Sequence, residues 1–478
     1  MNFAARLLLL GGGAVVALLV AEAGVPLAGS VWGGIFSRLA KGDGGFLLYA
    51  VGESTVVGEP FAPKISFPKI TARMFEDKIR GEPIRIINLA EQGACLEDQY
   101  WKLFRELFLR PPKGRGVLLI YAGINEPAGP DESRVFFAWR LWQRSIVLSR
   151  LEYLMRRDSE FLGAGFTDGK YETRLQKIIG LGKKHGLTVI VSTLVGNLRY
   201  EPTQDNAGVL EYFGEAYEAE RREEFRRALG LYEEARSATK GGVLAFKYFH
   251  TARCHERLGE YETAKEFYWK AVDCGNGRRP TRRQNRIIVG LAKKNGVLLV
   301  DAARRFEERA PHGIPGYDLF MDAHHPAILG YLLLATGFSE EIGRAFQTAR
   351  VWRTPTPADI ASFFEFGPED FFDTYISRVL WFCGEATEQE GRSERMEIAR
   401  RYLAAAERIH GENINVYLGH LMICTLEKDS LGIRHWLEKG KFLTENKDFF
   451  ETNTSAEFRG WFAKRLAEAV VSPAVGRE

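Results

Sequence analysis

The chain has 478 residues, which is too long for a single compact core and predicts about two to four domains. Apolar residues make up 45% and charged residues 27%, as is usual for a folded globular protein. The net charge is only +3, from 65 basic and 62 acidic side chains, which argues against nucleic acid as the main partner. The 5 cysteines form no CxxC pair, so neither a disulfide framework nor a zinc site is expected.

Residues 1–37 are expected to form a secretory signal peptide or an uncleaved membrane anchor. The stretch "RLLLLGGGAVVALLVAEAGVPLAG" is apolar apart from one arginine and Glu22, and continuing to Phe36 makes it long enough to span a bilayer. Ala21-Glu22-Ala23 also fits a small-x-small cleavage site. A buried core helix is a third interpretation, which three consecutive glycines disfavour. Either favoured interpretation predicts a membrane-anchored or exported protein whose remaining residues lie outside the cytoplasm.

The next 300 or so residues alternate apolar strands with helical patterns, which predicts a parallel sheet in a doubly wound α/β fold. Each candidate strand is a continuous apolar or β-branched run, as in parallel strands that are covered on both faces. The candidate strands are Phe46–Val51, Ile84–Leu89, Val117–Tyr121, Thr188–Thr193 and Val297–Asp301. Helical stretches such as Tyr100–Leu109 and Lys170–His185 lie between them.

Roughly a hundred residues separate the fourth strand from the fifth, far more than a usual αβ connection. The segments "ALGLYEEA" and "AKEFYWKA" share one spacing, with Ala228, Tyr232 and Ala235 in the first copy. Ala264, Tyr268 and Ala271 occupy the same places in the second copy. This repeat resembles the tetratricopeptide (TPR) family, and an ordinary helical hairpin is the alternative. We expect the insertion to stand beside the pocket as a wall or lid, or to be a protein-docking surface remote from the chemistry.

Beyond residue 350 the strand pattern stops and helical patterns continue, so we expect a C-terminal helical domain with TPR-like hairpins after the linker "RTPTPAD". The expected domains are an N-terminal segment, an α/β domain in two parts, the insertion and the C-terminal domain. Their bounds are 1–37 for the N-terminal segment, 38–205 and 277–350 for the α/β domain, 206–276 for the insertion and 351–478 for the C-terminal domain.

Polar residues follow several of the strands, at the edge where open parallel sheets form their sites. A hydroxyl such as that of Ser54 becomes a nucleophile when a base takes its proton, and His325 is a candidate base. Asp322, three residues earlier, can orient the imidazole. Backbone N–H groups at Ser54 and Gly93 and the amide of Asn125 can stabilise an oxyanion. The set predicts acyl-transfer chemistry.

The blocks "GEST", "NLAEQGA", "GINE" and "DAHHP", in this order, resemble those of the SGNH (GDSL-type) hydrolases. The resemblance covers about residues 44–205 and 280–340, and it implies a flavodoxin-like three-layer α/β/α fold. It also implies Ser54 as nucleophile, Gly93 and Asn125 as oxyanion donors, and Asp322 with His325 as the acid–base pair. Three positions depart from the family pattern, with Glu53 and Glu126 where aspartate is usual and Ala90 where glycine is common.

Several simpler interpretations stay open. Ser54 can cap a helix, Asn125 can be a turn residue, and His324 competes with His325 as the base. Asp322 and the two histidines are metal-ligand types, although no second cluster completes a shell. Two glutamates near the serine, Glu53 and Glu59, can act as a glycosidase pair or as plain loop acids. The basic run "RRPTRRQNR", residues 278–286, can meet an anionic substrate or lipid headgroups, or can be a solvated helix face.

The sequence therefore predicts a serine esterase that acts through an acyl-serine intermediate, without a cofactor. The alternatives are an O-acyltransferase that acts on a sugar or polysaccharide, and a TPR scaffold with an inactive hydrolase domain. The expected partners are an ester substrate, a membrane through the N-terminal segment and a protein bound by the TPR-like helices.

Overall fold

The computed structural model describes most of the chain from Gly45 onward. The described residues are 45–112, 115–126, 168–202, 208–235, 241–274, 279–353, 355–387 and 393–471. The predicted signal peptide or anchor lies outside these residues. Among the residues that are described, no helix is long and apolar enough to cross a membrane.

A six-stranded sheet forms the centre of the α/β part, in the order β2-β3-β1-β4-β5-β6. The strands are β1 (Phe46–Gly52), β2 (Lys78–Ile79), β3 (Glu82–Asn88), β4 (Gly116–Tyr121), β5 (Thr188–Ser192) and β6 (Leu298–Val300). All five predicted strands are present and pair in parallel, and their order is that of flavodoxin-like folds. The two-residue strand β2 was not predicted, and it pairs antiparallel with β3.

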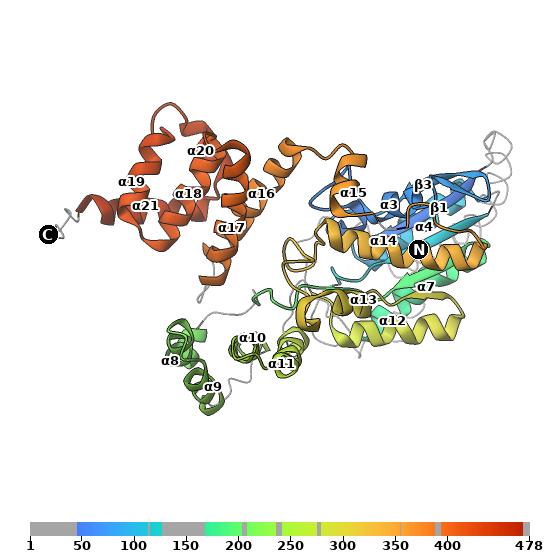
Figure 1. Ribbon diagram of the computed structural model, residues 1–478, viewed down its shortest axis with the longest axis horizontal. Helices are drawn as coiled ribbons and strands as arrows, with labels where there is room; N and C mark the ends of the chain where they lie inside the picture. Colours follow the sequence, from blue (N-terminus) through green and yellow to red (C-terminus); the bar gives the residue numbers. More distant parts are fainter. Residues whose placement is uncertain are drawn as a thin grey trace, which may run out of the picture.

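Helices cover both faces of this sheet (Figure 1). They are α2 (Ser54–Val57), α3 (Phe67–Arg73), α4 (Leu96–Leu109), α7 (Asp168–Lys184), α12 (Arg282–Asn295), α13 (Ala302–Arg309), a 3-10 turn (Pro311–Gly313) and α14 (Ile328–Phe346). Helix α14 contacts α3 and α13 on one side, and α7 contacts α4 and α12 on the other. The result is three layers, as the sequence pattern predicts.

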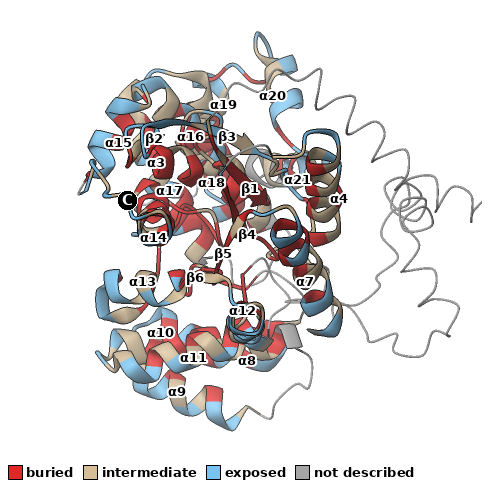
Figure 2. Cartoon of the chain, turned by 90° about the vertical axis from the view of Figure 1, so that its right-hand side faces the viewer, coloured by how far each residue is buried: buried red, intermediate tan, exposed pale blue. Residues whose placement is uncertain are grey.

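The core follows the apolar runs of the strands. Every residue of β4 is buried, and β1 is buried at all positions but one (Figure 2). Strand β3 departs from this pattern, since its residues are half-buried or exposed. Only the two residues of β2 lie beyond it in the sheet, so it is nearly an edge strand.

Two helical hairpins occupy the predicted insertion. They are α8 (Val209–Arg221) with α9 (Phe225–Glu234), and α10 (Gly241–Arg257) with α11 (Tyr261–Cys274). The small and aromatic residues of the repeat lie at the helix contacts: Ala228, Tyr232, Ala264, Tyr268 and Ala271 are buried, and Ala235 is partly buried. The periodicity thus placed the packing faces correctly, while the TPR character of these helices stays a prediction.

The C-terminal region is helical throughout its described part. It contains α15 (Pro357–Phe363), α16 (Pro368–Thr387), α17 (Ser393–His410), α18 (Ile414–Glu427), α19 (Ser430–Lys439), α20 (Lys447–Asn453) and α21 (Ala456–Val471). Helix α15 packs with the α/β core through Ile360 and Ala361, so this core extends beyond residue 350, where we expected it to end. Helices α16 to α21 form a second apolar cluster, which Tyr200 and Ala323 of the α/β part join.

A group of charged side chains, which we call the interdomain charge cluster, joins the three parts of the molecule. It consists of Glu201 from the α/β part, Glu220, His250 and Arg253 from the insertion, and Glu385, Glu394 and Arg395 from the C-terminal helices. His250 has no exposed surface, and its Nδ1 lies 2.8 Å from Oε2 of Glu220. Arg253 pairs with Glu394, and Nη1 of Arg395 lies 2.6 Å from Oε2 of Glu385. The insertion and the C-terminal helices are therefore bound to each other and to the α/β part by buried charge.

Candidate active site

The chain segments that follow β1, β3 and β4 leave the sheet at the same edge, and each carries a candidate site residue. Strand β1 lies between β3 and β4, with Ala50 beside Asn88 and Gly52 beside Tyr121 in the parallel register. The segments that leave these strands carry Ser54, Gly93 and Asn125, respectively. Adjacent parallel strands therefore bring together residues that are far apart in the sequence.

Gly52 allows the chain to turn directly from β1 into α2. A Cβ atom at this position would lie 2.1 Å from the carbonyl oxygen of Tyr121 and 2.3 Å from Cγ2 of Val56. Only glycine fits such a close approach without displacing the neighbouring strand. The amide of Asn88 donates to the carbonyl of Val56 at 3.0 Å and fixes the short helix. Ser54 is consequently held as the first residue of α2 and is 8% exposed.

The three residues predicted as nucleophile, base and acid are in hydrogen-bond contact. Nε2 of His325 lies 2.7 Å from Oγ of Ser54, although 271 residues separate them in the chain. Nδ1 of the same ring lies 2.7 Å from Oδ2 of Asp322. This arrangement has the hydroxyl, the imidazole and the carboxylate in the order that nucleophilic catalysis requires.

The loop that carries the acid and the base is closed by its own hydrogen bonds. Oδ1 of Asp322 accepts the backbone N–H groups of His324 at 3.1 Å and His325 at 2.9 Å. The N–H of Met321 donates to the carbonyl of His325 at 2.8 Å. Nδ2 of Asn197, which follows β5, donates to the carbonyl of Asp322 at 3.1 Å. These bonds leave Oδ2 of the carboxylate directed at the imidazole.

Asp322 is 3% exposed, and burial alone would raise the pKa of its carboxyl. The hydrogen bond and charge of His325, together with the guanidinium of Arg378, outweigh this effect and lower the pKa below its ordinary value. The carboxylate therefore stays ionised at neutral pH and can stabilise a positive charge on the imidazole.

Two of the predicted oxyanion donors, Gly93 and Asn125, lie in the loops after β3 and β4, and the third, the N–H of Ser54, follows β1. Nδ2 of Asn125 donates one hydrogen to the carbonyl of Ala94 at 3.2 Å, which leaves its second hydrogen for another acceptor. Gly93, next to Ala94, has a left-handed φ of 69° and is exposed. The N–H of Ser54 has no acceptor within its own helix, because it belongs to the first turn. Asn125 thus ties the loop of Gly93 to its own loop.

Three acids that stand out in the sequence, Glu53, Glu59 and Glu126, form hydrogen bonds or ion pairs with other parts of the protein. Oε1 of Glu53 accepts the N–H of Gly123 at 2.6 Å, and burial raises the pKa of this carboxyl to about 8. Glu126 accepts the N–H of Leu96 at 2.6 Å and pairs with Arg174 at 2.8 Å. The side chain of Glu59 is bonded to Gln92. Each of these three carboxyl groups thus contacts a different partner.

Asp322, His324 and His325 also form a group with metal-ligand atoms, all within 4.8 Å of one another. Both ring nitrogens of His325 are already bonded, one to Asp322 and the other to Ser54. A metal at this position would have to replace these hydrogen bonds, so the geometry favours the acid–base interpretation.

The 5 cysteines are free thiols.

Two residues of the basic run at residues 278–286, Arg279 and Gln284, have packing roles. Arg279 is 8% exposed and donates to the carbonyls of Asn197 and Leu198. Desolvation by burial lowers its pKa to about 10. Gln284 donates to the carbonyl of Gly123 at 2.8 Å, so this run helps to fix the loop after β4.

Sequence reasoning missed the residues of the C-terminal helices that contact the loop of the acid and the base. Nη1 of Arg378 on α16 lies 2.5 Å from Oδ2 of Asp322. The hydroxyl of Tyr402 on α17 donates to the carbonyl of Met321 at 2.8 Å. Neither residue is part of a motif, and each stands in a helical pattern that reads as an ordinary packing helix. No local signal could have linked them to the site.

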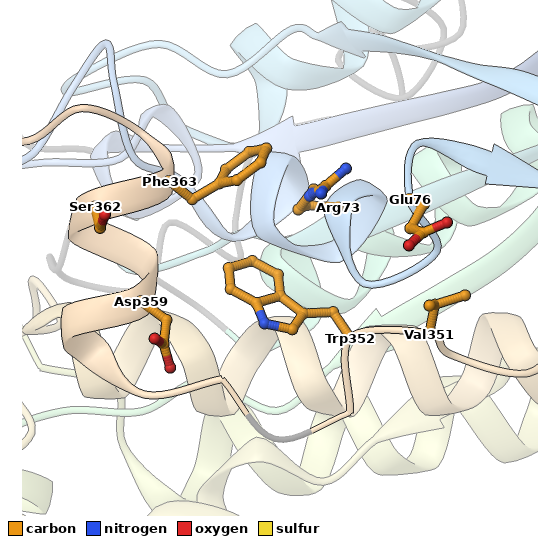
Figure 3. Close-up of a pocket in the computed structure, with 7 residues that line it drawn as sticks. All are labelled: Arg73, Glu76, Val351, Trp352, Asp359, Ser362 and Phe363. Carbon is orange, nitrogen blue, oxygen red and sulfur yellow. The ribbon is translucent and has the colours of Figure 1, made fainter.

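A separate surface pocket lies between α3 and α15, with a volume of about 400 Å³ (Figure 3). The guanidinium of Arg73 lies 4.2 Å from the ring centre of Phe363, and Trp352 lines the same pocket. None of the three triad candidates lines it. This pocket is therefore distinct from the candidate active site.

A scan of protein-family models finds no match to the sequence, and a search of curated proteins finds none. Similar solved structures include a variant of the acetyl xylan esterase Axe2 from Geobacillus stearothermophilus, which is 14% identical in sequence with a TM-score of 0.30. The match covers 63% of this chain and 96% of that esterase chain. A GDSL-like lipase from Bacteroides thetaiotaomicron has 11% identity and a TM-score of 0.32, covering 66% of this chain and 98% of that one. Similarity at these identities and TM-scores assigns no activity to this chain.

Proposed function

We propose that this chain is a serine esterase of the SGNH type, which hydrolyses an acyl ester through an acyl-Ser54 intermediate. The observation that carries the proposal is the hydrogen-bond chain from Ser54 through His325 to Asp322, with both links at 2.7 Å. The four sequence blocks, the flavodoxin-like strand order and the closed loop of the acid and the base support it.

In the proposed first step, Oγ of Ser54 attacks the ester carbonyl and His325 accepts the hydroxyl proton. Asp322 orients the imidazole and stabilises its positive charge, and it does not itself take the proton. The developing oxyanion is stabilised by the N–H groups of Ser54 and Gly93 and by the free amide hydrogen of Asn125. His325 then gives its proton to the leaving alcohol.

In the second step, a water molecule attacks the acyl-serine. His325 takes a proton from this water and returns it to Oγ of Ser54 as the second tetrahedral intermediate collapses, the acyl–Oγ bond breaks and the acid is released. No metal or organic cofactor is needed, because side chains and water supply every proton and nucleophile.

The test is an ester panel on the purified full-length chain, with nitrophenyl acetate, butyrate and octanoate beside acetylated sugars. We expect turnover of at least one ester, and a Ser54→Ala variant with the same fold should lose it. Adding a free sugar acceptor and following acyl-sugar formation distinguishes hydrolysis from transfer. Wild-type protein that turns over no ester in the panel would count against the proposal, as would equal rates for the wild type and Ser54→Ala.

We also propose, from the sequence alone, that residues 1–37 direct the catalytic domain out of the cytoplasm as a signal peptide or an anchor. Fractionation of cells that express the full chain tests this, because the mature protein should then be found in the membrane or exported fraction. From the sequence alone we also propose that the two hairpins are TPR-like. We further propose that the insertion forms a wall or lid beside the active-site pocket.

A further inference from the structure

An arginine from the C-terminal helical domain contacts the acid of the candidate triad. Nη1 of Arg378 lies 2.5 Å from Oδ2 of Asp322, and this same oxygen accepts the ring N–H of His325 at 2.7 Å. The side chains of Arg378 and Asp322 are 11% and 4% exposed. Charge-assisted hydrogen bonds in such a shielded place are stronger than those at a surface. The guanidinium therefore fixes the oxygen that in turn orients the imidazole.

A second helix of the same domain contacts the residue that precedes Asp322. The hydroxyl of Tyr402 on α17 donates to the carbonyl of Met321 at 2.8 Å. Its ring packs against Tyr375 and Phe382 of α16, at 6.0 Å between ring centres in each case. Two helices of the C-terminal domain thus contact the triad loop as one packed unit.

Helix α16 is held near both ends, so the position of Arg378 is fixed. Near its start, Nζ of Lys64 lies 2.7 Å from Oδ2 of Asp370. Near its end, Glu385 accepts hydrogen bonds from Tyr200 and Arg395, both at 2.6 Å. The contacts of Lys64 and Tyr200 join α16 to the α/β part on either side of the arginine.

We propose that Arg378 is a positioning residue of this active site, and that the C-terminal helical domain thereby completes the catalytic machinery instead of being a separate appendage. The inference rests on the proposed function. Arg378 touches neither the nucleophile nor the base and acts through Asp322, by keeping the carboxylate charged and directed at the ring. Its positive charge also opposes a second positive charge on the adjacent imidazole, so it affects how readily the Asp322–His325 pair holds a proton.

The test compares neutral and charged replacements of Arg378 in the full-length chain. The variants are Arg378→Gln, Arg378→Met and Arg378→Lys, with Arg408→Gln on the exposed side of α17 as the matched control. For each we would measure kcat and KM for the best ester of the panel across the pH range, together with the thermal unfolding midpoint.

The neutral variants should lose roughly 10- to 100-fold in kcat, which is the usual size of one hydrogen bond to a charged group, with little change in KM. The acidic limb of their activity profile should move to higher pH, because the acid–base pair loses a neighbouring positive charge. Arg378→Lys should keep the limb near its wild-type position, and Arg408→Gln should match the wild type in both respects. Using two neutral variants protects the test against one of them failing to fold.

A purely structural role predicts something else. Neutral variants that lose activity equally at every pH, with Arg378→Lys no better than they are, would overturn the inference, and so would neutral variants that match the wild type. In both cases the wild type remains an active esterase and the proposed function stands. Wild-type protein that neither hydrolyses esters nor reacts at Ser54 with a fluorophosphonate would instead refute the proposed function, and this inference with it.

Discussion

His250 is a buried histidine that the fold surrounds with acidic groups. Burial alone would lower its pKa, but the charge and hydrogen bond of Glu220, with a further contribution from Glu201, raise it to about 9. Arg253, Tyr217 and Tyr232 also lie around this site. Burial would raise the pKa of Glu220, yet the charge of His250 outweighs this effect and lowers it. The imidazole is therefore expected to be positively charged in the folded protein at neutral pH.

The magnitude follows from the difference between the folded and unfolded states. The ordinary pKa of histidine is 6.5 and that of the folded state is about 9, which corresponds to roughly 3 kcal/mol of folding free energy. Because the folded state holds the proton more tightly, this contribution is fully present below pH 6.5 and disappears as the pH rises through about 9. Stability should therefore fall with increasing pH across this window.

The assay is chemical denaturation of the full-length wild type and of a His250→Gln variant, from about pH 6 to about pH 10. Groups outside this cluster that titrate in this range affect both proteins alike, so the difference in their unfolding free energies reports on His250 together with its partner Glu220. We expect the wild type to exceed the variant in unfolding free energy by the largest amount at the lowest pH. This difference should shrink by roughly 3 kcal/mol across the range. A difference that stays constant with pH would refute the claim that a charged His250 stabilises the junction.

Three further predictions concern the candidate active site and its supports. Asp322→Asn should reduce kcat by about 10³- to 10⁴-fold in the ester assay, since the amide cannot orient the ring as the carboxylate does. Asn125→Ala should reduce kcat by about 10²- to 10³-fold with a smaller effect on KM, as expected for a lost oxyanion donor. Gly52→Ala should prevent correct folding, because its Cβ would lie 2.1 Å from the carbonyl oxygen of Tyr121, and circular dichroism with thermal unfolding measures this.

Each of these three predictions can fail separately. Full activity of Asp322→Asn would remove the acid from the mechanism, and full activity of Asn125→Ala would leave this amide as a turn residue. A well-folded Gly52→Ala protein would show that the chain can pass Tyr121 by another path.

The fold was largely predictable because the strands β1, β4 and β5 are continuous apolar runs with clear turn signals after them. The short β2 was missed, since two residues carry no periodic signal. The packing faces of the insertion followed from the spacing of Ala228, Tyr232 and their repeats. By contrast, Ile360 and Ala361 follow a linker-like stretch, so nothing local indicated that α15 packs with the α/β core.

The triad candidates were predictable because each stands at the end of a strand or in a loop with a recognisable block. Parallel pairing then brings such loops to one edge, whatever their separation in the sequence. Arg378 and Tyr402 were not predictable, because their roles depend on how two domains dock. Glu126 stood out in the sequence only as a departure from the family pattern, whereas its contacts with Leu96 and Arg174 give it a structural role that only the fold reveals.

The most direct test of the central claim is covalent labelling of the wild-type chain with a fluorophosphonate, followed by intact mass measurement and peptide mapping. We expect a single adduct at Ser54, no adduct in Ser54→Ala and much slower labelling in His325→Gln, because the imidazole activates the hydroxyl. Labelling at a different serine, or none at all in a well-folded wild-type protein, would contradict the proposal that Ser54, His325 and Asp322 work as a catalytic triad.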